Sequence, residues 1–237
     1  MTSGQAIATD PAWICGLLQL NDSFFPTGAY AHSFGLESLA QADVVRDRAT
    51  LREFVFRAVL PSLRYLELPL ARHAGQAFSA ADWSEIESLS FLSAATKAAR
   101  ELRQASEAIG RQRAELVASL RQSELAREYL RRAQAGGWPF SSSISAALEG
   151  VALGAPPEAV ASAIYYASAA GVLAAAMKLL RIGQNASQSL LTEVLAEAPH
   201  LIAASQQVAR EDMGWFNPWL DIASARHEHA EARLFIS

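Results

Sequence analysis

One stretch in the second half of the chain constrains its fold more than any other. Residues 159–177 contain no formally charged side chain, and nine of these nineteen residues are alanine. The stretch is about as long as a membrane span requires, but alanine, serine and glycine bury little apolar area compared with leucine or phenylalanine. The stretch therefore predicts the central helix of an all-helical domain, and Gly171 within it is expected to mark close packing between helices, including those of a dimer.

Helical patterns recur along the rest of the chain, whereas convincing alternating strand patterns do not. Residues 50–53 and 82–85 have the spacing of capping boxes, which predicts a helix start at each. We expect Pro61 to kink or end the first of these helices. Residues 136–139 (Gly-Gly-Trp-Pro) predict a turn, and Gly183 is expected to end the Ala-rich helix.

No repeat, low-complexity segment or long linker divides the chain. We therefore predict one all-α domain over residues 1–237, a bundle of about ten helices around the Ala-rich helix. Residues 1–11 are expected to be a flexible N-terminus, and residues 221–237 a partner-binding C-terminal tail.

Composition restricts the compartment and the partners. The net charge of -4 and the pI near 5.8 argue against general nucleic-acid binding. The single cysteine, Cys15, excludes an internal disulfide and fits the reducing cytoplasm. Residues 1–11 carry neither a basic cluster nor a long apolar run, so no signal peptide is expected. Proteins or small molecules are the expected partners.

The C-terminal tail carries apolar side chains where most chains fray. Leu234, Phe235 and Ile236 follow Arg233, and a solvated tail has no use for them. Arg226 and Arg233 are fork-shaped donors suited to carboxylates. The pattern predicts an anchor, either on the protein's own surface or on a partner, and an ordinary closing helix packed on the core has the same composition.

Serine, histidine and acidic residues gather within residues 17–37, which invites a hydrolase interpretation. His32 and Ser33 are neighbours in the sequence, so their side chains would point apart on a helix. No Gly-x-Ser-x-Gly elbow surrounds Ser23 or Ser33. A turn at residues 26–28 that presents Tyr30 and His32 as contact surface is favoured. An all-α enzyme with His32, Glu37 and His227 in a pocket remains the alternative.

The histidines of the tail resemble a metal-binding pair. His227 and His229 lie two residues apart, so on a helix they would point in different directions, whereas on an extended chain both could bind one ion. A direct metal-binding chaperone is therefore a third hypothesis. Farther upstream, Lys97, Arg100 and Glu101 have the spacing of a solvated, salt-bridged helix face.

Four segments in a fixed order resemble the UreF family of urease accessory proteins. They are Leu-Leu-Gln-Leu…Phe-Pro-Thr-Gly…Ser-Phe-Gly-Leu-Glu within residues 17–37, Lys…Ala-Arg-Glu-Leu-Arg…Ala-Ser…Gly-Arg within residues 97–111, Leu-Leu-Arg-Ile-Gly-Gln-Asn-Ala-Ser-Gln at residues 179–188, and Ser-Ala-Arg-His-Glu…Arg-Leu-Phe within residues 224–235. Each segment alone is weak, but together they cover the whole chain.

The resemblance implies a non-enzymatic, homodimeric chaperone that binds the partner protein UreD, called UreH in some systems. This complex would recruit the nickel-carrying GTPase UreG, modulate its GTP hydrolysis and deliver nickel to apo-urease, without a cofactor of its own. The resemblance assigns partner binding, by position, to Arg226, His227, Glu228, Arg233, Leu234 and Phe235, and assigns structural motif roles to Gly28, Ser33, Gly35, Glu37, Lys97, Arg100, Glu101, Arg103, Gly183, Gln184 and Gln188.

The chain also departs from the family pattern. Ile236 stands where the tail usually has an arginine, which removes one cation from the expected partner surface. Trp138 replaces a histidine in the middle turn, and Ala170-Gly171 replaces Asn-Gln in the long helix. These departures bear on partner specificity and not on the fold.

Overall fold

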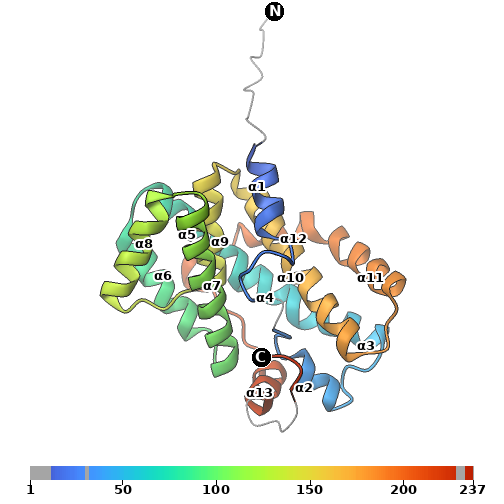
Figure 1. Cartoon of the computed structure of the whole chain (residues 1–237). Coiled ribbons are helices and arrows are strands. Elements are labelled where there is room, and N and C mark those ends of the chain that lie inside the picture. The colour runs from blue at the N-terminus through green and yellow to red at the C-terminus, as the bar shows by residue number, and fades with distance from the viewer. Residues whose placement is uncertain (1–11, 30–31, 228–232, 237) are drawn as a thin grey trace, which may run out of the picture.

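The computed structural model describes residues 12–29, 32–227 and 233–236. Over these residues the chain forms helices and connecting turns (Figure 1), so the prediction of an all-α fold is confirmed. In chain order the elements are α1 (Ala12–Leu20), α2 (Leu36–Gln41), α3 (Arg48–Phe54), η2 (Val55–Val59), α4 (Leu60–Ser62), η3 (Leu63–Glu67), α5 (Leu68–Ser79), α6 (Trp83–Ala95), α7 (Arg100–Leu120), α8 (Glu124–Gly136), α9 (Ser142–Leu153), α10 (Pro157–Leu179), α11 (Gln184–Ala196), α12 (Ala198–Ser205), η4 (Arg210–Asp212) and α13 (Pro218–His227).

The segments α3 to α5 run on as one helix, and Pro61 does not end it. Two π-helical turns, η2 and η3, lie on either side of the proline, and the Leu60 and Leu68 amides bond to carbonyls five residues back, those of Val55 and Leu63. Proline lacks an N–H group and its ring needs space in the preceding turn. The wider turns on either side accommodate this defect, which corrects the expected break.

The predicted helix starts and the predicted roles of two glycines can be compared with the structure. Asp82 caps α6 as expected, with its carboxylate accepting from the Glu85 amide. The other capping box is shifted: Asp47, and not Thr50, is the N-cap residue, because its carboxylate accepts from the Thr50 amide while the Thr50 hydroxyl accepts from the Asp47 amide. Gly137 ends α8 in the left-handed conformation. Gly183 does not end α10, which stops at Leu179, but precedes α11 as its N-cap residue.

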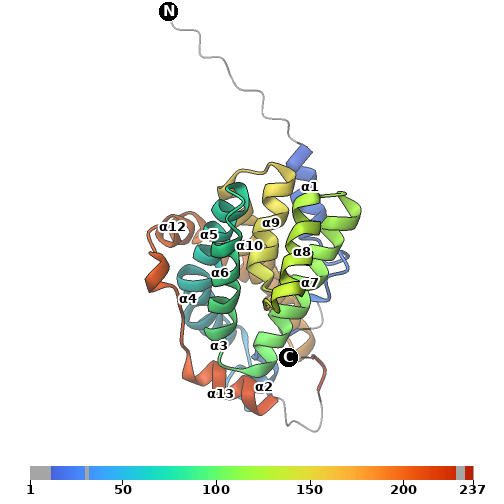
Figure 2. The same ribbon diagram turned by 90° about the vertical axis from the view of Figure 1, so that its left-hand side faces the viewer.

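Helix α9 is the most enclosed element, and it packs between α5 and α7 (Figure 2). Its residues from Ser143 to Gly150 are all buried. The Ala-rich α10 lies beside α9 and also contacts α5, α11 and α12. By length and composition α10 is the one described helix that could cross a membrane, with 44% of its most apolar window buried. Its contacts make it an internal helix of the bundle.

The close helix approach occurs at a different glycine from the one expected. A Cβ on Gly171 of α10 would meet nothing within 4 Å, and the residue is exposed. A Cβ on Gly110 of α7 would lie 2.5 Å from the carbonyl carbon of Ser141, just before α9. Gly171 thus makes no close helix contact within the chain, because it lies on the outer side of α10, and its expected role at a dimer interface stays a prediction.

Candidate functional site

Helices α2 and α13 lie together at one end of the bundle, beside the C-terminal end of the chain (Figures 1 and 2). Gly35, which precedes α2, has a φ of 83°, a value that glycine adopts readily. A Cβ there would lie 2.7 Å from both Leu220 and Ser224 of α13. Gly35 therefore permits both the turn into α2 and the close approach of α13, and it places Glu37 inside.

Glu37, Glu101 and His227 meet in the interior, and we call them the Glu-His-Glu cluster. The His227 Nε2 atom lies 2.9 Å from Glu37 Oε2, and its Nδ1 atom lies 2.7 Å from Glu101 Oε2. His227 is 1% exposed and Glu37 is 2% exposed. The cluster thus joins α2, α7 and α13 through one imidazole ring.

The last described residues, Arg233–Ile236, bind to the same two carboxylates. The Leu234 and Phe235 amides donate to the two oxygens of Glu37, at 2.7 and 3.0 Å. Arg233 Nη1 donates to Glu101 Oε1 at 3.1 Å. These bonds confirm that the tail contains an anchor for the protein's own surface.

The anchor also includes a buried apolar side chain, that of Phe235. Phe235 is 5% exposed, and the Lys178 ammonium of α10 lies 5.1 Å from the centre of its ring.

Burial alone would raise the pKa of Glu37. Hydrogen bonds from the Leu234 amide, His227 and the Phe235 amide outweigh that effect and lower the pKa, so Glu37 is held as a carboxylate.

Helix α13 has two distinct faces. Leu220, Ala223, Ser224 and His227 have helical spacing and face inward, and apart from half-buried Leu220 they are buried. The opposite side, which we call the outer face of α13, carries the exposed residues Trp219, Ile222 and Arg226. Leu234 and Ile236, which lie beside the anchored Phe235, are exposed as well. One end of the molecule therefore presents large apolar side chains to solvent on a firmly held backbone.

The structure brings only part of the sequence-predicted residues to this end. The residues that converge there are Glu37, Glu101, His227, Arg233, Leu234 and Phe235. The Ser33 hydroxyl accepts from the Glu37 amide at 3.3 Å. Gln184 and Gln188 lie on α11, which packs on α3, α10 and α12. Gly28 has a φ of 80° and open space around it. Tyr30, Glu228 and His229 lie outside the described residues.

Lys97, Arg100 and Glu101 do not form the expected solvated face. Lys97 precedes α7, which begins at Arg100, so its side chain cannot pair along that helix. Its ammonium instead lies 3.1 Å from Glu67 Oε1, and its carbonyl accepts from Arg103. Glu101 turns inward to His227 and Arg233.

The contacts of His32, Glu37 and His227 bear on the enzyme alternative. Glu37 and His227 are in contact, and both ring nitrogens of His227 face carboxylates. His32 is buried, and burial lowers its pKa, although the negative charge of Glu101 opposes the shift. Among the described residues, no group of three or more His, Cys, Asp or Glu side chains could hold a metal ion.

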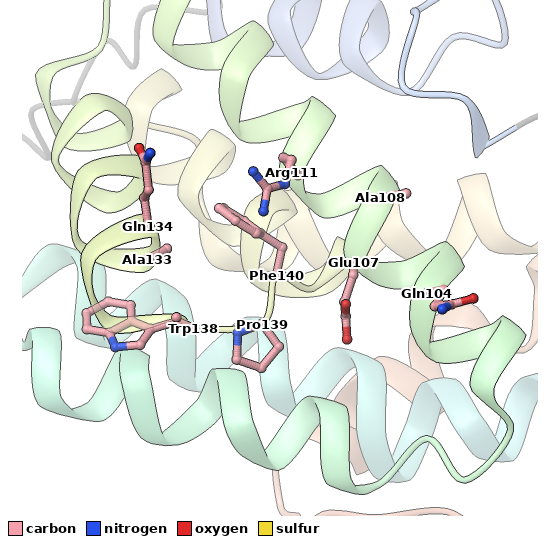
Figure 3. Close-up of a pocket in the computed structure, with 10 residues that line it drawn as sticks. Gln104, Glu107, Ala108, Arg111, Ala133, Gln134, Trp138, Pro139 and Phe140 are labelled. Atoms are coloured by element: carbon pink, nitrogen blue, oxygen red, sulfur yellow. The ribbon is translucent and has the colours of Figure 1, made fainter.

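A pocket of about 550 Å³ lies elsewhere, between α7 and the turn that follows α8 (Figure 3). Arg111 lies over the ring of Phe140, with Glu107, Gln104 and Gln134 along the rim. None of the residues proposed for catalysis lines this pocket. It offers a cation, a carboxylate and amides, but no histidine or nucleophile.

Two features escaped the sequence analysis. The first is the outer face of α13, because the helical spacing of Trp219, Ile222 and Arg226 was not used to predict a shared surface. The second feature is a buried ion pair in which Arg113 Nη1 of α7 lies 3.1 Å from Glu149 Oε2 of α9. Burial raises the pKa of Glu149 to about 7, against the opposing charge of Arg113. No short-range pattern in the sequence indicates an ion pair between these two helices.

Comparisons with known proteins place the chain in a family. The family model for UreF matches residues 45–195. The chain is 31% identical over 224 residues to the urease accessory protein UreF of Paenarthrobacter aurescens (strain TC1), covering 93% of this chain and 96% of the relative. It is 28% identical to that of Bacillus sp. (strain TB-90), covering 94% and 99%, and 30% identical to UreF 2 of Brucella suis (strain ATCC 23445 / NCTC 10510), covering 93% and 90%. The chain belongs to the UreF family of urease accessory proteins.

Proposed function

We propose that this chain is a non-catalytic scaffold of urease maturation that acts in the cytoplasm. It binds UreD, or its equivalent UreH, and recruits the GTPase UreG, so that nickel passes through the complex to apo-urease. The chain itself forms a homodimer, keeps no cofactor and modulates GTP hydrolysis by UreG. Nickel is the cargo of the assembly in this proposal.

One observation carries the proposal: the tail is anchored at the end of the bundle where the family-motif residues Glu37, Glu101 and His227 converge. Buried hydrogen-bonded carboxylates hold its backbone, while Leu234 and Ile236 stay 62% and 64% exposed. Large apolar side chains on a rigid backbone cost little ordering entropy when a partner covers them. This combination is suited to recognition.

The outer face of α13 extends the proposed surface. Trp219 is 78% exposed, and Ile222 is about half exposed. Arg226 lies on the same face and is suited to a carboxylate of the partner. Tryptophan and arginine are enriched among the residues that dominate interface energies. We therefore expect a partner surface with an apolar centre and an acidic rim.

Co-expression with UreD and UreG, followed by size-exclusion chromatography with light scattering, tests the scaffold. The wild-type chain should elute in a complex whose mass requires all three proteins. A Trp219→Ala/Ile222→Ala double variant should weaken the complex at least tenfold while its circular dichroism stays that of the wild type. Leu120→Ala is the matched control, because Leu120 is 58% exposed but lies at the far end of α7.

Deletion of residues 226–237 should abolish the complex altogether, since it removes the anchor as well as the exposed side chains. A wild-type chain that elutes alone in the presence of both partners would contradict the scaffold. Turnover of a substrate by the isolated chain would favour the enzyme alternative instead.

A further inference from the structure

Each π turn of the long helix α3–α5 contains the residue that lies four positions before a proline. Arg57 lies in η2, four residues before Pro61, and Tyr65 lies in η3, four residues before Pro69. In a regular α-helix each carbonyl accepts from the amide four residues later, and proline has no N–H group to donate. The sequence therefore leaves two carbonyls of this helix without their regular donor.

The Tyr65 carbonyl bonds to a distant part of the chain. The Gly214 amide donates to it at 3.0 Å. The ring of Trp215 stacks on the ring of Tyr65, with centroids 6.0 Å apart and an interplanar angle of 14°. These residues belong to the segment 213–217, which we call the strap and which connects η4 to α13 along the side of the bundle (Figure 2). The strap is thus clamped to η3 by one backbone bond and one aromatic contact.

The second carbonyl that faces a proline provides a comparison. In the described part of the chain, the Arg57 carbonyl accepts no backbone bond from another segment. The covalent defect is the same at both prolines, and Pro61 is half-buried while Pro69 is buried. The difference lies in what packs against each turn, since α12 and the strap meet η3.

The clamp determines where the partner surface begins. Phe216 in the strap is 69% exposed, and Trp219 in the first turn of α13 is 78% exposed. Both follow directly after the residues that are fixed to η3. At its other end α13 is held by His227, which contacts Glu37. The helix is therefore attached at both ends, while its outer face stays open to solvent.

We propose that Tyr65 and Pro69 are positioning residues for the partner surface: Pro69 withholds the regular helix donor from the Tyr65 carbonyl, which then fixes the strap and the first turn of α13. The consequence for binding rests on the proposed scaffold function, whereas the clamp belongs to the isolated chain. A preformed surface loses less conformational freedom when a partner covers it. Releasing the clamp should therefore weaken binding without removing any side chain of the outer face of α13.

NMR on the isotopically labelled full chain tests the clamp. A scalar coupling across the hydrogen bond should link the Gly214 amide nitrogen to the Tyr65 carbonyl carbon. The Gly214 amide should also exchange with solvent more slowly than an unstructured amide does. An unprotected Gly214 amide that shows no such coupling in the wild-type chain would overturn the proposal.

Two matched variants test the role of the missing donor. Pro69→Ala supplies an N–H group that competes for the Tyr65 carbonyl, so protection of the Gly214 amide should fall roughly fivefold to tenfold, the equivalent of one hydrogen bond. Pro61→Ala supplies the same group one π turn earlier and should leave Gly214 unchanged. The amide of Leu148 in the buried helix α9 reports global opening and is the reference for both.

The outcome is read relative to that reference. Unchanged protection of Gly214 in Pro69→Ala, or an equal loss in Pro61→Ala, would refute the role of Pro69. Trp215→Leu removes the stacked ring and should loosen Gly214 as well, which tests the clamp without altering the helix. Tyr65→Phe keeps both the ring and the carbonyl, so it should behave as the wild type.

Binding to UreD separates positioning from stability. Pro69→Ala and Trp215→Leu should weaken this complex about tenfold while exchange at Leu148 stays that of the wild type, and Pro61→Ala and Tyr65→Phe should bind normally. Full binding by a Pro69→Ala chain with a loosened strap would refute the positioning role. A wild-type chain that shows the coupling but does not bind UreD would refute the scaffold and, with it, this role. A wild-type complex without the coupling would refute only the present inference.

Discussion

Replacing Gly110 with alanine should destabilise the chain, whereas the same replacement at Gly171 should stabilise it. Both glycines lie inside long helices, Gly110 in α7 and Gly171 in α10. A Cβ on Gly110 would lie 2.5 Å from the carbonyl carbon and 2.6 Å from the carbonyl oxygen of Ser141, while a Cβ on Gly171 would meet nothing within 4 Å. The two variants therefore share their chemistry and differ only in packing.

The magnitude follows from two opposing effects. Alanine inside a helix is favoured over glycine by roughly 0.8–1 kcal/mol, which both variants gain. At Gly110 the obstacle is backbone, and it must retreat by about 1 Å to restore an ordinary contact. Overpacking of this kind costs about 1–3 kcal/mol. Because the helix preference cancels between the variants, Gly110→Ala should be less stable than Gly171→Ala by about 2 kcal/mol.

Urea unfolding followed by circular dichroism measures this difference, and calorimetry gives it as a temperature. For a chain of this length, about 2 kcal/mol corresponds to a separation of roughly 4–8 °C in Tm, with Gly171→Ala above the wild type. Equal stability of the two variants would refute the packing argument, because nothing else distinguishes the positions. A stabilised Gly110→Ala variant would show that Ser141 and the start of α9 yield freely.

Three further predictions concern stability. Asp47→Ala removes the capping box of α3 and should cost about 1 kcal/mol in urea unfolding, and an unchanged midpoint would contradict the reciprocal bonds. Tyr165→Phe deletes the 2.6 Å bond to the Val194 carbonyl and should cost about 1–2 kcal/mol by the same assay, so a neutral effect would show that water reaches this carbonyl. Burial raises the pKa of Glu149 from 4.5 to about 7, so this carboxyl favours folding below pH 4.5 and that contribution is lost as the pH rises through 7. The free energy of unfolding, measured from about pH 5 to about pH 8, should therefore fall in the wild type relative to Glu149→Gln by about 2.5 kcal/mol. A difference between variant and wild type that does not change with pH would refute the shift.

Local chemistry made much of the secondary structure predictable. The cap at Asp82 and the left-handed Gly137 each depend on a few neighbouring residues. Where two candidate capping residues lie close together, the sequence pattern indicated the wrong one: Thr50 was expected to cap α3, and Asp47 does. The expected break at Pro61 was wrong for another reason. The π-helical turns on both sides accommodate the proline ring and the missing N–H group, and nothing in the sequence pattern indicates a π turn.

The spacing of residues in the sequence could not predict that the Glu-His-Glu cluster forms. Glu37 and His227 are 190 residues apart, and Glu101 and His227 are 126 apart, so only the folded chain brings them together. Family resemblance marked all three positions without indicating that they touch. The same resemblance grouped Gln184 and Gln188 with them, although α11 packs elsewhere.

The bond between the Phe235 amide and Glu37 spans 198 residues, and this has a consequence for the synthesis of the chain. A ribosome adds about 5–20 residues per second, so Glu37 exists for roughly 10–40 seconds before its last hydrogen-bond donor is made. Until then its carboxylate and that of Glu101 must stay hydrated, and α2 and the N-terminal part of α7 cannot complete their packing. A nascent or prematurely terminated chain thus lacks the finished end of the bundle, and only a fully translated copy can present it.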